Sequence, residues 1–226
     1  MPEPKELLES SRVIASELVE LRRQLHQIPE FALDLPLTQS LLLEKLAGLG
    51  EITLGKSLTS IALLIRGGNP GPTVLLRADM DALHVTEETD LDFASTNGYM
   101  HACGHDLHMS SAVGAAKLLH EIKDTLNGDV LIWFQPGEEG HGGADVMIEE
   151  GMLEVSGSMP VASYGLHVFT SLPAGVIACK PGAIMASAGD MNVVFEGAGG
   201  HASMPWLSKD PVAPMVDAIS SLQTML

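Results

Sequence analysis

The sequence predicts an α/β fold in which a mostly parallel sheet is covered by helices on both faces. Strand-length apolar runs alternate along the chain with segments of helical periodicity, as in sheets built from strand–helix–strand units. The run 129–134 is apolar at nearly every position, which is typical of a strand buried on both faces. A length of 226 residues allows one large domain, or one domain with part of a second.

Hydrophobic periodicity and turn residues locate the expected elements. Helices are expected over about 6–28, 37–49, 107–123, 144–150 and 211–226, and strands over about 60–66, 73–78, 129–134, 161–168 and 190–196. Pro29 should end the first helix, and Thr38 is a candidate N-cap of the second. The Gly- and Pro-rich segment 67–72 should form a tight turn that joins the first two strands.

Three of these strands deliver polar residues to the loops that follow them. Asp79 comes at the end of the second strand, Glu138 and Glu139 follow the third, and His167 ends the fourth. Open α/β sheets bind their ligands at the carboxyl ends of the strands. The pattern therefore favours an enzyme.

The character of the sequence changes after about residue 186. Residues 190–196 alternate like a strand with one exposed face, and 197–205 form a glycine-rich turn that carries His201. We therefore expect one domain over 1–185 and the start of another over 186–226. The last helix reaches the final residue with no following strand or loop, so this second domain is expected to be incomplete.

The composition excludes several classes of protein. With 12 basic and 29 acidic residues, the formal net charge is −17, which repels nucleic acid and anionic membrane surfaces. The N-terminus lacks the basic and apolar regions of a secretion signal, and no apolar run approaches the roughly 20 residues of a membrane-spanning helix. A soluble cytoplasmic protein is expected, in which Cys103 and Cys179 are reduced thiols.

The run 101–108, with the sequence HACGHDLH, concentrates residues that can bind metals. The Cys103 thiolate and the His105 imidazole lie two residues apart and can point at one ion. Two other interpretations stay open: a loop with a buried cysteine and solvated histidines, or a nucleophilic Cys–His pair. Residues two apart rarely adopt the hydrogen-bonded geometry of a nucleophile and its base, which disfavours the pair.

Glu138 and Glu139 are neighbouring carboxylates at the mouth of an apolar strand. Like charges at this separation are unfavourable without a cation or a proton between them. With a divalent metal, one glutamate can be a ligand while the other acts as general base toward the activated water. Consecutive glutamates are also common on helix surfaces, where they have no catalytic role.

Four further residues are candidates from their positions alone. His167, at a strand end, is either an additional ligand or a structural histidine. Asp79 and Asp81 could be ligands or could orient a ligating imidazole; we prefer this supporting role for Asp79, whereas Asp81 could simply cap the turn. His201 lies in a glycine-rich turn, where the backbone can approach a ligand closely.

Five motifs occur in a fixed order along the chain: Arg77–Leu83, His101–Asp106, Gln135–Glu139, Gly165–His167 and Gly199–Ser203. Together they resemble the M20 peptidase family, in its aminoacylase, hippurate hydrolase and auxin-conjugate hydrolase branch. The resemblance runs over nearly the whole chain. It implies a metal-dependent, exopeptidase-like catalytic domain interrupted by a smaller α+β lid and dimerisation domain, which would begin at about residue 186.

The same resemblance implies that Cys103, His105, Glu139 and His167 bind two divalent metal ions, with the Cys103 thiolate as a possible bridge between them. Zn²⁺ is the first expectation, and Mn²⁺, Co²⁺ and Ni²⁺ are alternatives. Family members are longer, so the rest of the lid and a final metal-binding histidine are expected beyond Leu226. A homodimer through the lid is implied for the full-length protein.

The implied reaction is hydrolysis of the amide bond of an N-acyl amino acid, hippurate-like or related, to a carboxylic acid and a free amino acid. Glu138 would be the general base toward a metal-activated water, and His201 would contact the scissile carbonyl or the substrate carboxylate. Three alternatives stay open: a dipeptidase of the same family, a non-catalytic metal-binding fragment or interaction module, and a thiol hydrolase that uses Cys103.

Two departures from the family pattern lie beside the motifs. His84 and Gly137 replace a more usual proline and alanine, which would tune specificity without abolishing metal binding. Residues 1–226 expressed alone are expected to show at most a trace of the full-length activity. They are also expected to self-associate through the unpaired strand 190–196.

Overall fold

The computed structural model describes residues 2–186, 189 and 191–225, and the chain divides into two compact units, Met1–Leu172 and Pro173–Leu226. The helices are α1 (Pro4–Gln27), α2 (Pro36–Leu46), α3 (His105–Ile122), α4 (Gly143–Glu149) and α5 (Val212–Gln223), with short 3₁₀ turns η1 (Lys123–Thr125), η2 (Met152–Glu154) and η3 (Pro205–Leu207). The strands are β1 (Glu51–Leu54), β2 (Ile61–Ile65), β3 (Val74–Asp79), β4 (Val130–Gln135) and β5 (Ala162–Gly165). The predicted boundary at 185/186 falls inside the second unit and stays a prediction.

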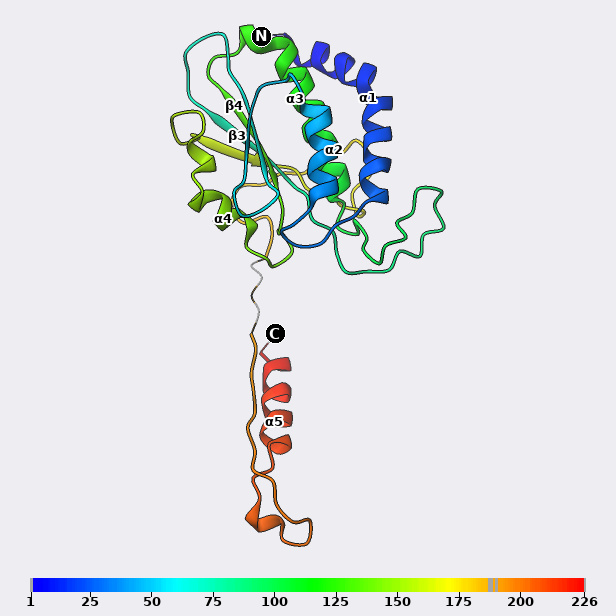
Figure 1. Cartoon of the computed structure of the whole chain (residues 1–226), viewed down its shortest axis with the longest axis vertical. Coiled ribbons are helices and arrows are strands. Elements are labelled where there is room, and N and C mark those ends of the chain that lie inside the picture. Colours follow the sequence, from blue (N-terminus) through cyan, green and yellow to red (C-terminus); the bar gives the residue numbers. More distant parts are fainter. Residues whose placement is uncertain (1, 187–188, 190, 226) are drawn as a thin grey trace. The chain divides into compact units, whose positions relative to one another are not determined.

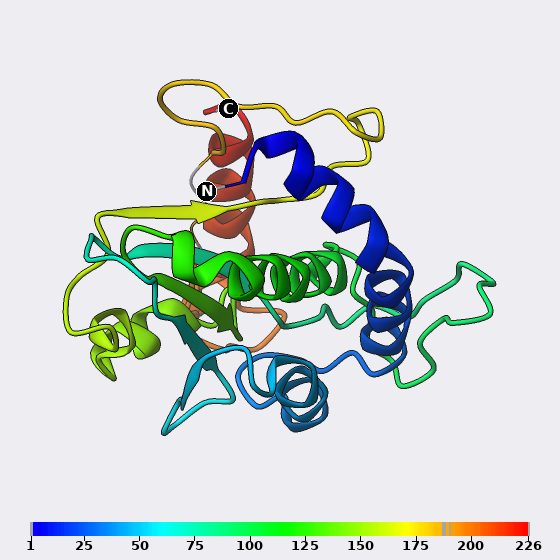
Figure 2. The same cartoon turned by 90° about the horizontal axis from the view of Figure 1, so that it is seen from above.

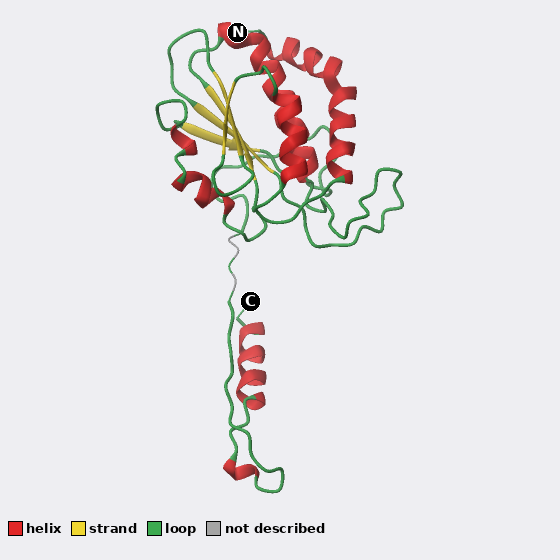
Figure 3. Cartoon of the chain, viewed as in Figure 1, coloured by secondary structure: helices red, strands yellow, loops and turns green. Residues whose placement is uncertain are grey.

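The first unit is built on one five-stranded sheet with the order β1-β2-β4-β3-β5. The strands β4, β3 and β5 run parallel, whereas β2 is antiparallel to both of its neighbours, β1 and β4. Figures 1 and 3 show α1, α2 and α3 on one side of the strands and α4 on the other. The predicted α/β class, with a sheet covered on both faces, is confirmed.

The central strand β4 shows why the sheet needs cover on both faces. All six of its residues are buried, and successive side chains point to opposite faces. Ile132 and Phe134 belong to the apolar cluster formed with α1, α2 and α3, whereas Leu131 and Trp133 belong to the cluster formed with α4 and η2. The near-continuous apolar run therefore supplies two cores at once.

The pairing of β2 and β3 differs from the simplest expectation. They follow each other along the chain, but β4 lies between them, so the segment 67–72 joins two strands that do not pair. This segment crosses the start of β4, where the Asn69 carbonyl accepts from the Gly128 N–H and the Pro72 carbonyl accepts from the Asp129 N–H. The backbone N–H and C=O groups on both edges of the buried β4 need hydrogen-bond partners. β2 supplies them on one edge and β3 on the other.

Several local predictions also need correction. Thr38 is not an N-cap, because α2 begins at Pro36 with Leu35 in the capping position, and Thr38 is buried. The short edge strand β1, whose four residues are all exposed, was not predicted. The described residues 191–196 form no strand, and residue 190 of the predicted strand lies outside the described residues.

Other expectations agree with the structure. The helix α1 ends at Gln27 with Ile28 as its C-cap, two residues before Pro29, as predicted. Cys103 and Cys179 are both free thiols. Among the described helices, none is long and apolar enough to cross a membrane.

Replacing Ile132 by alanine tests the packing of the central strand. Ile132 is completely buried, so Ile132→Ala should lower the free energy of unfolding by about 2–5 kcal/mol. Urea unfolding followed by circular dichroism measures the change. Val13→Ala is the matched control, because Val13 is 80% exposed and its truncation should change the stability little. Equal stability of both variants would contradict the assigned core.

Candidate metal centre

The sheet and the start of α3 bring the predicted site residues other than His201 to one place in the first unit. The parallel strands β4, β3 and β5 are neighbours, so their carboxyl ends lie side by side. Glu138 and Glu139 follow β4, Asp79 is the last residue of β3, and His167 follows β5, which ends three residues earlier than the predicted strand 161–168. The N-terminus of α3 adds His105, with Cys103 just before it.

His105 lies at the centre of this cluster and is buried. Its Nε2 atom is 3.7 Å from Asp79 Oδ1, 3.8 Å from Glu138 Oε2 and 3.8 Å from Glu139 Oε1, all too long for hydrogen bonds. Neither ring nitrogen of His105, nor Glu139 Oε1, has a hydrogen-bond partner. Two ligands of one ion, each about 2.0–2.3 Å from it, lie roughly 3–4 Å apart, so these spacings fit a metal.

Cys103 and His167 also lie close to His105. The Cys103 Sγ atom is 3.4 Å from His167 Nε2, and His167 Nδ1 is 2.7 Å from the Val168 carbonyl oxygen. Since a carbonyl only accepts, Nδ1 carries a proton there, and Nε2 is left free to bind an ion. Cys103, His105 and His167 each offer an atom within 4.8 Å of the others, and His105, Glu138 and Glu139 do the same.

The electrostatics of the cluster are unfavourable in the protein alone. Burial raises the pKa of Cys103 to about 12, and the carboxylates of Glu139, Glu138 and Asp79 add to this shift. Burial also raises the pKa of Glu138, with a further contribution from Glu139. A thiol with a raised pKa is a poor nucleophile. Bound divalent cations would have the opposite effect on these pKa values, because they stabilise the charged thiolate and carboxylate forms together.

Asp81 and Gly137 set the position of the two glutamates. The Asp81 carboxylate accepts hydrogen bonds from the backbone N–H groups of Glu138 (2.9 Å) and Glu139 (3.0 Å), so it caps the turn that carries them. Gly137 has a φ of 68°, a left-handed conformation that favours glycine. The glycine at this position therefore suits the turn that aims both side chains at His105.

A second glycine brings the His167 loop against α3. Gly104 occupies the N-cap position of α3 with a φ of 86°, and a Cβ atom there would collide with the Val168 side chain. Only glycine satisfies both the conformation and the close approach. The glycine between Cys103 and His105 is therefore needed for packing.

Asp79, for which a supporting role is predicted, contacts Arg77 and His108. It accepts a hydrogen bond from Arg77 Nη1 at 2.6 Å, and its Oδ1 is 2.6 Å from His108 Nδ1. Burial alone would raise the pKa of Asp79, but the hydrogen bond to His108 and the nearby His105 and Arg77 lower it. His108 is the contact that sequence reasoning left without a role; its i+3 spacing from His105 on one helix was the available signal.

The remaining residues of the 101–108 run face a different environment. His101 is buried, neither of its ring nitrogens has a partner, and burial lowers its pKa to about 4. Asp106 accepts from His26 Nδ1 at 2.7 Å and lies 2.7 Å from Arg22 Nε, which ties α3 to α1. The long loop 84–99, which projects from the first unit in Figures 1 and 2, joins the same network through Glu87 and His26.

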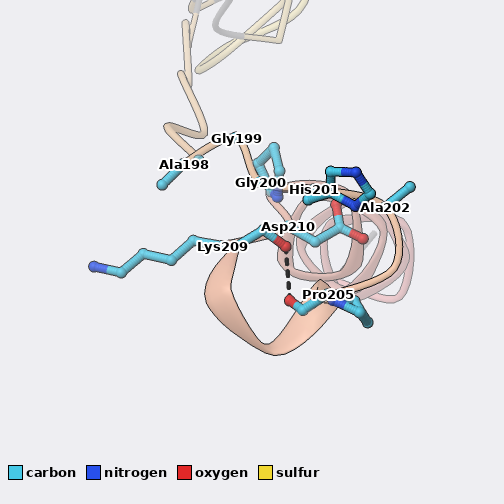
Figure 4. Close-up of a pocket in the computed structure, with 11 residues that line it drawn as sticks. Ala198, Gly199, Gly200, His201, Ala202, Pro205, Lys209 and Asp210 are labelled. Carbon is cyan, nitrogen blue, oxygen red and sulfur yellow. Dashed lines mark hydrogen bonds between the residues drawn. The ribbon is translucent and has the colours of Figure 1, made fainter.

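His201 belongs to the second unit. It lies in the glycine-rich turn, where its Nδ1 accepts a hydrogen bond from the Ser203 N–H at 3.2 Å. Figure 4 shows the cleft that it lines together with Gly200, Pro205 and Lys209. The turn is closed by mutual backbone hydrogen bonds between Ala198 and Lys209. The role of His201 toward a substrate stays a prediction.

Comparison with known proteins gives one consistent family. N-acetyldiaminopimelate deacetylase of Listeria monocytogenes is 41% identical over 214 residues, which cover 93% of this chain and 57% of the relative. Thermostable carboxypeptidase 1 of Saccharolobus solfataricus is 42% identical over 206 residues, which cover 89% of this chain and 51% of the relative. The chain thus spans little more than half the length of these curated relatives.

Solved structures and the model of one protein family indicate the same family membership. The YxeP protein of Bacillus subtilis, a dinuclear metal-binding peptidase from the M20 family, has a TM-score of 0.70 and 37% identity, covering 75% of this chain and 47% of its own. A protein of methicillin-resistant Staphylococcus aureus described as an aminohydrolase has a TM-score of 0.81 and 32% identity, covering 98% of this chain and 59% of its own. The model of peptidase family M20/M25/M40 matches residues 75–224. The chain therefore belongs to peptidase family M20/M25/M40.

Proposed function

We propose that this chain carries the principal metal centre of an amidohydrolase that cleaves the amide bond of N-acyl amino acids. The observation that carries the proposal is that two candidate metal-binding groups, Cys103–His105–His167 and His105–Glu138–Glu139, share His105, whose ring nitrogens have no hydrogen-bond partner. A buried set of polar atoms without partners is costly unless a ligand completes it. Cys103, His105, Glu139 and His167 would hold two divalent ions.

In the proposed reaction, the two metal ions and Glu138 have different roles. When bound, the two ions supply an activated water and polarise the substrate carbonyl. The Glu138 side chain is partly exposed and 3.8 Å from His105 Nε2, so its carboxylate can reach substrate and still belong to the cluster. It would accept a proton from the attacking water at an Oε atom and return it to the leaving nitrogen.

The comparisons narrow the substrate class. A relative that is 41% identical acts, by its name, on N-acetyldiaminopimelate, which favours an acetyl group on the amine of an amino acid. A benzoyl group, as in hippurate, is the second acyl group to test. We further propose that His201 contacts the carbonyl or carboxylate of the substrate.

A second candidate function is peptide hydrolysis. The 42% identical thermostable carboxypeptidase 1 supports it, because the same centre can attack a peptide bond next to a free carboxylate. Comparing N-acetyl amino acids with dipeptides as substrates of the full-length protein separates the two activities.

We also propose that the full-length protein is a homodimer. The helix α5 exposes a row of apolar side chains in the second unit, namely Val212, Met215, Val216, Ile219 and Leu222. Burying such a surface against a second copy would stabilise both copies.

Removing a predicted ligand should remove metal. Cys103→Ala and His105→Ala in the full-length protein should each reduce bound Zn²⁺ from about two equivalents per subunit, because each substitution removes a predicted metal ligand. Elemental analysis after dialysis measures the content. Cys179→Ala is the matched control, because Cys179 is an exposed free thiol, and it should retain full occupancy. Unchanged metal in both ligand variants would refute the assignment.

Substitution of the two glutamates should affect metal binding and turnover differently. Glu138→Gln should retain metal and lose turnover by a factor of about 100 or more, because an amide cannot accept the proton of water. Glu139→Gln should bind metal more weakly, because it loses a charged ligand. Zn²⁺ titration calorimetry and hydrolysis of an N-acetyl amino acid measure the two effects separately. Full activity in both variants would remove the pair from the mechanism.

A further inference from the structure

We propose that His108 is a positioning residue of the metal centre, whose neutral imidazole carries its proton on Nδ1 and ties Asp79 to the loop that holds His167. The inference rests on the proposed metal site and assigns a role to a residue that the mechanism does not use. His108 is buried on α3, one turn after His105. Its ring stacks on that of His105 at 5.5 Å and meets the ring of His167 edge-on at 4.8 Å.

The hydrogen bonds of His108 define its tautomer. The Val168 backbone N–H points at His108 Nε2 at 3.0 Å. A backbone N–H can only donate, so Nε2 must accept and carries no proton. The proton of the neutral ring is therefore on Nδ1, which lies 2.6 Å from Asp79 Oδ1 and donates to it.

This arrangement excludes His108 as a ligand. Asp79, His105 and His108 offer atoms within 4.8 Å of one another, so their spacing alone would allow a third metal-binding group. However, Nδ1 of His108 is occupied by a proton and the lone pair of Nε2 by the Val168 N–H. Of these residues, only His105 has ring nitrogens with no partner. The ion is therefore expected on the His105 side of this group.

His108 joins three elements that carry the site. From α3 it reaches the end of β3 through Asp79 and the segment after β5 through Val168, which directly follows His167. Without the imidazole, the buried Asp79 carboxylate loses a donor and the Val168 N–H loses its acceptor. The His167 loop would then keep its packing on Gly104 and the contact of His167 Nε2 with Cys103 Sγ. Weaker metal binding should follow, since residues that orient a ligand typically contribute about 10–100-fold in affinity.

Nuclear magnetic resonance tests the tautomer directly. In the full-length protein with ¹⁵N-labelled histidine, His108 should show a protonated Nδ1 and an unprotonated Nε2, both before and after the addition of Zn²⁺. His105 and His167 should shift when Zn²⁺ is added. A protonated Nε2 on His108, or a metal-induced shift typical of a ligating nitrogen on its ring, would overturn the proposal.

Substitutions test the positioning role. His108→Ala should weaken Zn²⁺ binding by about 10–100-fold in calorimetry. His108→Asn, which restores a donor near Asp79, and His108→Gln, which restores an acceptor near Val168, should each recover part of the loss. His120→Ala is the matched control, because His120 lies on the same helix and bonds the Leu49 carbonyl at 2.8 Å, so its loss should affect stability but not Zn²⁺ affinity.

The outcomes separate this inference from the proposed function. If the unaltered protein binds no Zn²⁺, the proposed metal centre fails. If it binds Zn²⁺ and the His108→Ala variant binds equally well, only the role of His108 fails. If His108→Ala does not fold, the Asn and Gln variants and the tautomer of the unaltered protein still decide: Zn²⁺ affinity equal to that of the unaltered protein in both variants would overturn the proposal.

Discussion

The parallel pairing of β3 with both β4 and β5 is the constraint on which the site depends. Because the three strands run in the same direction, their carboxyl ends lie at one edge of the sheet. The residues at and just after these strand ends are thereby brought close together, although Asp79 and His167 are far apart in sequence. The helix α3, which packs on the same sheet, starts at this edge and adds His105. A change of register in β4 would move Glu138 and Glu139 away from the cluster.

Burial in the site disfavours the charged forms of two of its acidic groups. The pKa of Cys103 is raised to about 12 and that of Glu138 is also raised, chiefly by burial. Such shifts mean that the charged forms are disfavoured in the folded protein by itself. Divalent cations would favour the charged forms, so metal binding and folding are expected to be coupled.

Hydrogen bonds to backbone N–H groups position the segments that carry the proposed ligands. Asp81 holds the N–H groups of both glutamates, and His108 holds that of Val168. Gly104 and Gly137 give the two turns conformations that other residues adopt only with strain. The proposed ligand side chains thus lie on turns whose geometry is fixed by neighbouring residues, which is the arrangement expected of a preorganised site.

The sequence by itself determined most of the elements and the candidate site residues. The period of apolar positions distinguishes helix from strand locally, and the HACGHDLH run and Glu138–Glu139 stand out by composition. Only the tertiary structure decided that β4 lies between β2 and β3, because strand pairing depends on contacts between distant segments. The same is true of Asp81 and His108, whose roles come from backbone N–H groups far away in sequence. Local patterns report which way a side chain faces, but not which partner it meets.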